Sequence, residues 1–227
     1  MSLSIAQQSV EQLGGQASIL ARQRRDHAEL DRLMNLYTSG GRPREERQQT
    51  LKDIIQLTFS HAFAEETVLW PALRRLAPDG EELTSRVEKE HQEINDLVAD
   101  IERTDPDDAR HDHLTGRVFA LIQQDIRDEE DLLLPRLQEA LGHDPARLRR
   151  LGSAWETVRR TAPTHPHPAV PRRPPGNALA GVPLSAFDRA RDLLPAGTRA
   201  FRGRRAAAAI AALLAVWLVG VSVRRKR

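Results

Sequence analysis

Residues 54–72 read IIQLTFSHAFAEETVLWPA, and this stretch decides how the chain folds. Its apolar side chains recur at the three- and four-residue spacing that places them on one helix face. Two polar residues one turn apart, His61 and Glu65, interrupt that face. An imidazole and a carboxylate that point with the apolar residues must enter the interior of the protein. The stretch therefore predicts a long helix that carries a polar pair into a core.

Three other stretches have the same helical period, so the sequence predicts four long helices at about 16–38, 43–77, 80–103 and 108–141. Short turns rich in glycine, proline and aspartate separate them, and short links make consecutive helices antiparallel neighbours. Aromatic residues make up only 4% of the chain, and helix-forming residues dominate it. The predicted fold class is all-α, an up-down-up-down four-helix bundle.

The composition changes sharply near Arg160, which indicates one domain with an appendage. The predicted parts are a bundle at 1–160 with its core at about 15–141 and an extra helix at 145–160, a Pro-rich linker at 161–183, a short amphipathic helix with a basic segment at 184–205, and an apolar helix at 206–223. The prolines of the linker favour an extended chain. We expect its His165 and His167 to be exposed polar residues rather than ligands.

Residues 206–223, AAAAIAALLAVWLVGVSV, form an uncharged run between two groups of arginines. At 1.5 Å per residue a helix over this run is roughly 27 Å long, just enough to cross the hydrocarbon layer. The alternative is an alanine-rich helix that docks on the protein or on a partner. The N-terminus has no charged leader or apolar segment typical of secretion. We therefore expect a single-pass tail anchor with the bundle in the cytoplasm.

The net charge of +2 hides an asymmetry, because the residues before Arg172 carry about −8 and the rest about +10. An acidic bundle repels nucleic acid, which is not an expected partner, whereas a basic tail suits anionic lipid head groups. The chain has no cysteine, which excludes disulfides, thiolate zinc sites and iron–sulfur clusters. Any bound metal must be held by histidines and carboxylates.

Polar residues interrupt the apolar stripe of every predicted long helix. They are His27, His61, Glu65, His91, Asp125 and Glu129. An unpaired buried carboxylate destabilises a protein by on the order of several kcal/mol, even after the surrounding structure relaxes. A bound cation is the simplest compensation. Imidazole and carboxylate ligands on facing helices suit iron first, with manganese or zinc behind it. The alternative is a plain bundle whose polar residues satisfy one another.

Two segments of the chain look like copies of one unit. Residues 61–71, HAFAEETVLWP, and 125–135, DIRDEEDLLLP, match at the paired glutamates, at one leucine and at the final proline. The second and fourth helices therefore carry the same arrangement of polar residues, and four interrupted stripes with a repeated motif are hard to obtain by chance.

These segments, with Asp26-His27 and Glu90-His91, resemble the hemerythrin family, specifically bacterial proteins with an HHE cation-binding domain. The resemblance covers roughly 15–141, and the extension that follows looks like that of actinobacterial members. It implies a four-helix bundle with a non-haem di-iron centre. His27 and His61 would be terminal ligands of one iron, His91 a terminal ligand of the other, and Glu65 and Glu129 the bridges. Asp26, Glu66 and Glu130 point elsewhere, toward solvent or toward hydrogen bonds with the ligands.

The sequence departs from the family at two positions. Asp125 stands where the motif has a histidine four residues before the bridging glutamate, and Asn95 stands where hemerythrins have a second histidine after His91. An added anion favours ferric iron and disfavours reversible oxygen binding. The second iron would then have few ligands and be open to small molecules.

Three functions remain open at this stage. The first is a membrane-tethered iron protein that binds or senses oxygen, nitric oxide or peroxide, or handles iron. The second is a di-iron enzyme that detoxifies peroxide or nitric oxide, although the sequence shows no separate acid–base pair. The third is a structural bundle with a degraded metal site. Metal content distinguishes the third from the other two, whereas turnover distinguishes the first two.

Overall fold

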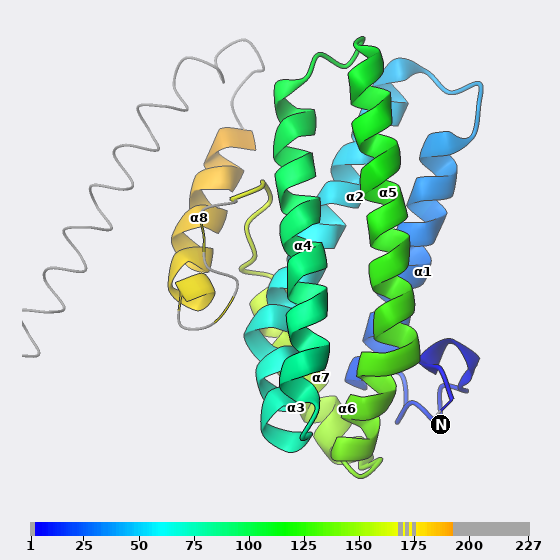
Figure 1. The fold of residues 1–227 in the computed structure, drawn as a ribbon, viewed down its shortest axis with the longest axis vertical. Coiled ribbons are helices and arrows are strands. Elements are labelled where there is room, and N and C mark those ends of the chain that lie inside the picture. The colour runs from blue at the N-terminus through cyan, green and yellow to red at the C-terminus, as the bar shows by residue number, and fades with distance from the viewer. Residues whose placement is uncertain (1–2, 168–169, 171–172, 174–175, 193–227) are drawn as a thin grey trace, which may run out of the picture. The chain divides into compact units, whose positions relative to one another are not determined.

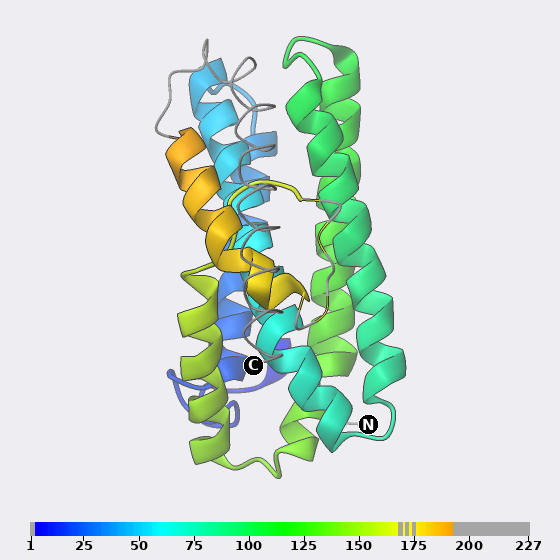
Figure 2. The same cartoon turned by 90° about the vertical axis from the view of Figure 1, so that its left-hand side faces the viewer.

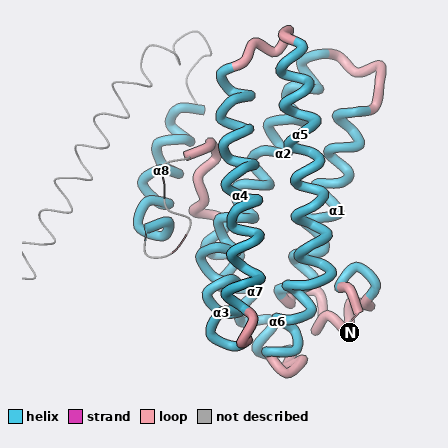
Figure 3. The backbone as a smooth tube through the Cα atoms, in the orientation of Figure 1, coloured by secondary structure: helices cyan, strands magenta, loops and turns pink. Residues whose placement is uncertain are grey.

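The computed structural model describes residues 3–167, 170, 173 and 176–192. It divides the chain into two units, Met1–Ser185 and Ala186–Arg227, and the fold of the first unit is described here. In the part of the chain that the structure describes, every regular element is a helix (Figure 3). The predicted all-α class is confirmed.

The four predicted long helices are all present, with ends within a few residues of the prediction (Figure 1). They are α1 (Ile19–Thr38), then α2 (Arg44–Ala64) continued by η2 (Glu65–Leu69) and α3 (Trp70–Leu76), then α4 (Gly80–Arg103), and finally α5 (Ala109–Asp128) continued by η3 (Glu129–Leu133) and α6 (Leu134–Ala140). The pairs α1 with α2 and α4 with α5 pack most extensively. Tight turns therefore make antiparallel neighbours, as the sequence predicts.

The second and fourth long helices each contain one wide π-helical turn, η2 and η3. In these turns the N–H of Trp70 donates to the carbonyl of Glu65, and the N–H of Leu134 donates to the carbonyl of Glu129. Each donor is followed by a proline, which lacks an N–H and crowds the carbonyl four residues earlier. The wider turn accommodates the proline without breaking the helix. Both turns begin at a glutamate of the predicted site, Glu65 in η2 and Glu129 in η3.

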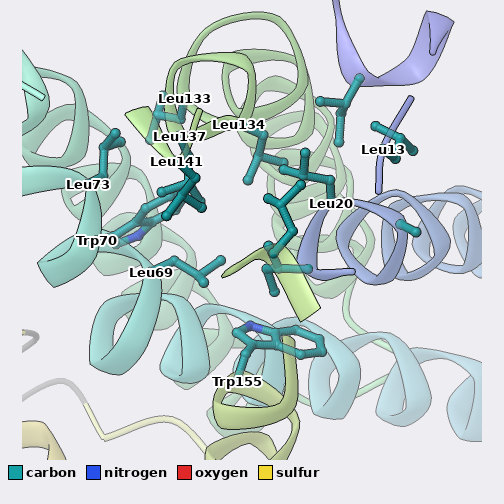
Figure 4. Close-up of a cluster of buried hydrophobic side chains, with 14 of the residues drawn as sticks. Leu13, Leu20, Leu69, Trp70, Leu73, Leu133, Leu134, Leu137, Leu141 and Trp155 are labelled. Carbon is teal, nitrogen blue, oxygen red and sulfur yellow. The ribbon is translucent and has the colours of Figure 1, made fainter. Parts of the chain in front are cut away.

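The interior has two separate apolar clusters. One contains Leu69, Trp70, Leu133 and Leu137 with other residues at the end of the bundle where η2 and η3 lie (Figure 4). The other contains residues such as Ile54, Ile94, Val118 and Ile122 toward the opposite end. Along each long helix a polar residue of the predicted site lies where one cluster gives way to the other, namely His27, His61, His91 and Glu129. The bundle thus buries one polar layer between two apolar ones.

An additional helix, α7 (Pro145–Arg159), packs against α1, α2 and η2. It begins where the Asp144 side chain accepts hydrogen bonds from the N–H groups of Ala146 and Arg147. Gly152 lets the helix approach α1 closely, since a Cβ there would lie 2.8 Å from the carbonyl oxygen of Ala17. Trp155 is fully buried as a result. The helix predicted at 145–160 is therefore part of the bundle.

The chain after α7 corrects two expectations. Residues 161–167 form no helix, as their prolines predict, but they are half-buried rather than exposed. A helix, α8 (Gly176–Asp192), begins inside the range predicted as linker and contains Pro183. The alanine- and leucine-rich sequence after Gly176 outweighs the single proline. The predicted apolar helix at 206–223 lies outside the described residues, and none of the helices among the described residues is long and apolar enough to cross a membrane.

Candidate metal centre

The structure brings all six residues of the predicted site together. One group comprises His27, His61, Glu65 and Glu129, and a second comprises His91, Asp125 and Glu129; within each group the possible ligand atoms lie within 4.8 Å of one another. Every one of these residues is buried, with at most 7% of its surface exposed. Glu129 belongs to both groups, so the two groups adjoin.

The two glutamates that open the π-helical turns each face both halves of the site. Glu65 places Oε1 3.0 Å from Nε2 of His61 and Oε2 3.8 Å from Nε2 of His91. Glu129 places Oε2 3.1 Å from Nε2 of His27 and Oε1 3.8 Å from Nε2 of His91. Each carboxylate thus presents one oxygen to each group, which is the arrangement expected of two bridging ligands.

A second set of carboxylates contacts Nδ1 of the three histidines, the ring nitrogen that does not face the other site residues. Nδ1 of His27 lies 2.8 Å from Glu130, Nδ1 of His61 lies 3.3 Å from Asp26, and Nδ1 of His91 lies 2.9 Å from Glu66. Each of these carboxylates is the chain neighbour of a residue in the site. Of the two roles open to them from the sequence, hydrogen bonding to the site residues is the one observed.

These contacts decide which ring nitrogen keeps the proton when each imidazole is neutral. An ionised carboxylate can only accept, so Nδ1 of each histidine donates and a neutral ring keeps a lone pair on Nε2. Nε2 of His27 lies 3.2 Å from Nε2 of His61, and both face the oxygens of Glu65 and Glu129. Lone pairs from nitrogens and oxygens thus converge on one small volume that a cation would fill.

Electrostatic effects inside the site are large and opposed. Burial and the neighbouring Glu129 carboxylate raise the pKa of Glu65 to about 7. Burial would also raise the pKa of Glu129, but contacts with the three histidines hold that pKa well below its usual value. Burial would lower the pKa of His27, yet Glu129 and Glu130 raise it to about 9. Protons balance the charge of the metal-free site, and a metal ion would displace them.

The oxygens of Glu65 and Glu129 indicate whether these side chains could hold a metal ion. Both oxygens of Glu65 and both oxygens of Glu129 are buried and have no hydrogen-bond partner among the described residues. Buried polar groups normally find partners, and a buried carboxylate without one is costly. Four such oxygens in a layer with three imidazole nitrogens form the donor set of a hard to borderline metal ion.

The second group has three members and the first has four, but Glu129 belongs to both and Glu65 also faces His91. Asp125 Oδ1 lies 3.4 Å from Nε2 of His91. Asn95 is 3% exposed, and its Oδ1 accepts the backbone N–H of His167 at 3.2 Å. The residue that stands in place of a histidine therefore holds the segment that follows α7.

Sequence reasoning missed the contribution of α7 to the site. The ring of Trp155 meets the ring of His61 edge-on with centroids 5.6 Å apart, and Arg159 Nη2 lies 3.2 Å from Asp26 Oδ2. Arg159 also lies over Trp155, 5.1 Å from its ring centroid. An arginine outside the four long helices thus positions the carboxylate that supports His61. One signal for this was present in the sequence. Arg159 lies seven residues, or about two helical turns, after Gly152, and therefore on the same face of α7.

The histidines outside the site differ in burial. His113 and His143 are exposed, whereas His111 in the first turn of α5 is 7% exposed. Tyr37 packs in the second apolar cluster against Phe119. His165 and His167 belong to neither ligand group.

Comparison with known proteins gives two matches. Residues 18–160 match the family profile described as Hemerythrin HHE cation binding domain. An uncharacterized hemerythrin-like protein of Schizosaccharomyces pombe (strain 972 / ATCC 24843) is 24% identical over 135 residues, which cover 59% of this chain and 66% of the relative. The match thus spans slightly less than two thirds of that protein. No solved structure matches the chain significantly.

Proposed function

The chain belongs to the hemerythrin family of HHE cation-binding domains, and on that premise we propose that it holds a non-haem di-iron centre that binds or senses oxygen, nitric oxide or peroxide. The observation that carries the proposal is the pair of buried glutamates whose oxygens face both ligand groups. His27 and His61 would complete one side, and His91 and Asp125 the other. Iron bound there would supply a redox-active site for a small ligand.

The protein's own residues have defined tasks in this function. Asp26, Glu66 and Glu130 hold the imidazoles in one tautomer and orientation, which raises their basicity as ligands. The apolar clusters on either side of the layer exclude water and keep the local dielectric low. Trp155 covers the His61 side of the site. With both glutamates shared, each side would have only two further protein ligands, which leaves room for an external molecule.

The test uses the full chain loaded anaerobically with ferrous iron and then desalted. We expect about two irons per chain, as in helical carboxylate di-iron proteins, and a change in the absorption spectrum on adding nitric oxide. A folded chain that retains no iron would rule out the proposal.

A detoxifying enzyme is the second candidate, because two shared glutamates and two further ligands on each side would leave a position open to a substrate. The same iron-loaded protein distinguishes the two functions. Repeated consumption of hydrogen peroxide or nitric oxide with iron retained would indicate an enzyme. Stoichiometric binding without turnover would indicate a binding or sensing protein.

We also propose that residues 206–223 anchor the protein to a membrane, from the uncharged run and its flanking arginines. The full chain, expressed in cells, should stay with the membrane after carbonate extraction. A chain truncated after Arg205 should be released, and one truncated after Val223, which keeps the apolar run, should remain bound. Release of the full chain by carbonate would contradict the anchor.

A further inference from the structure

The segment that follows α7 is fastened along one side of the bundle (Figure 2, yellow). We call residues 161–185 the strap, of which the structure describes 161–167, 170, 173 and 176–185. Its polar contacts to the bundle are His165 Nδ1 to Glu102 at 2.5 Å, the His167 N–H to Asn95 at 3.2 Å, Arg173 to Glu88 and to Glu81 at 2.7 Å each, and Asn177 to Thr67 at 3.2 Å. These contacts run from one end of α4 to the other and reach η2.

The strap also packs closely on α2. A Cβ at Gly181 would lie 2.3 Å from Cζ of Phe63, so a larger residue there would lift the strap or displace the ring. Glu88 is 7% exposed and also pairs with Arg74, whereas the Arg173 side chain is 45% exposed, so the ion pair between Arg173 and Glu88 is partly shielded from solvent. The strap is therefore held by both shape and charge.

A small cavity of about 40 Å³ lies between the strap and the bundle. Phe59, Phe63, Glu66 and Asn95 line it on the bundle side, and His167 and Leu184 are among the strap residues that line it on the other. Because one water-sized probe needs roughly 10–15 Å³, the cavity has room for about three water-sized atoms. A molecule of two or three heavy atoms would therefore fit.

The cavity adjoins the His91 half of the site. Glu66 lines it and accepts the hydrogen bond from Nδ1 of His91 at 2.9 Å. Asn95, which also lines it, lies one turn from His91 on α4. The buried Glu66 carboxylate opposes an anion, whereas the two phenyl rings favour an uncharged molecule. Size, charge and position together select a small neutral ligand.

We propose that this cavity is an antechamber through which a neutral molecule of two heavy atoms, such as nitric oxide, dioxygen or hydrogen peroxide, reaches the His91 side of the centre, and that the strap controls its opening. This inference rests on the proposed iron site. It assigns a task to Asn95 and to the Pro-rich strap that the metal ligands do not explain. Arg173 and Leu184, the two strap residues changed in the test, are not candidate metal ligands, so changing them should leave the iron content unaltered.

The experiment compares three full-length variants with the wild type after ferrous loading. Arg173→Ala unfastens the strap, Leu184→Phe fills the cavity, and Arg117→Ala is the matched control, because it breaks an ion pair with Glu93 on α4 outside the strap. Stopped-flow absorption gives the association rate of nitric oxide. Hydrogen exchange of the peptide that contains His167 reports strap opening without any dependence on iron.

In Arg173→Ala we expect hydrogen exchange and nitric oxide association to accelerate about threefold, since losing the Arg173 ion pairs raises the population in which the strap is open. Leu184→Phe should slow association several-fold with exchange unchanged, and Arg117→Ala should match the wild type. Faster exchange with an unchanged association rate would overturn the antechamber, as would unchanged exchange in Arg173→Ala. If the wild-type protein bound no iron, the proposed function itself would be ruled out. If all the variants bound as much iron as the wild type and associated with nitric oxide at the same rate, only the antechamber would be ruled out.

Discussion

Replacing Glu129 with alanine is expected to reduce the metal content from about two ions per chain to nearly none. Glu129 is the one residue that belongs to both ligand groups, and its two oxygens face opposite halves of the site. Without it, both ions lose a ligand, and the negative charge that offsets their positive charge is reduced. Elemental analysis of the iron-loaded, desalted protein measures the effect.

The matched control is Asp131→Asn, which removes an exposed carboxylate from the same π-helical turn. This variant should retain the wild-type metal content, because its side chain lies outside both groups. Circular dichroism shows whether each variant keeps its helical content. If folded Glu129→Ala still held two ions, Glu129 would not be a ligand shared between them.

The second large effect is the separate loss of each ion. His61→Ala removes a ligand from the group of four, and Asp125→Ala removes one from the group of three. Each variant is expected to retain about one iron per chain, because the other group keeps all its own ligands. The iron that remains should differ in its spectrum between the two variants, since its ligands differ.

His111→Ala is the control for His61→Ala, because His111 is equally buried but belongs to neither group. Its metal content should equal that of the wild type. Unchanged iron in His61→Ala would remove this residue from the ligand set. Loss of both ions in Asp125→Ala would mean that the two groups do not bind independently.

The sequence alone predicts the long helices and the six residues of the site. Helical periodicity places each polar residue on an apolar stripe, and a stripe on a bundle helix can face only the core. Short turns then set the helices antiparallel, which brings the middle of each to a similar height. His27, His91 and Glu129 therefore meet although they are far apart in the sequence.

Other features depend on contacts that periodicity does not encode. The π-helical turns at Glu65 and Glu129 follow from prolines, but their effect on the glutamates appears only in three dimensions. Arg159 reaches Asp26 because α7 docks beside α1, and no pattern in the four long helices requires that. The docking of the Pro-rich strap depends on single contacts, such as that of His167 with Asn95.

Anomalous diffraction at the iron edge from crystals of the iron-loaded protein tests the central claim most directly. The account predicts two iron peaks inside the bundle, one among His27, His61, Glu65 and Glu129 and one beside His91 and Asp125, with Glu129 between them. Iron located elsewhere, or no iron peak in this polar layer, would contradict it.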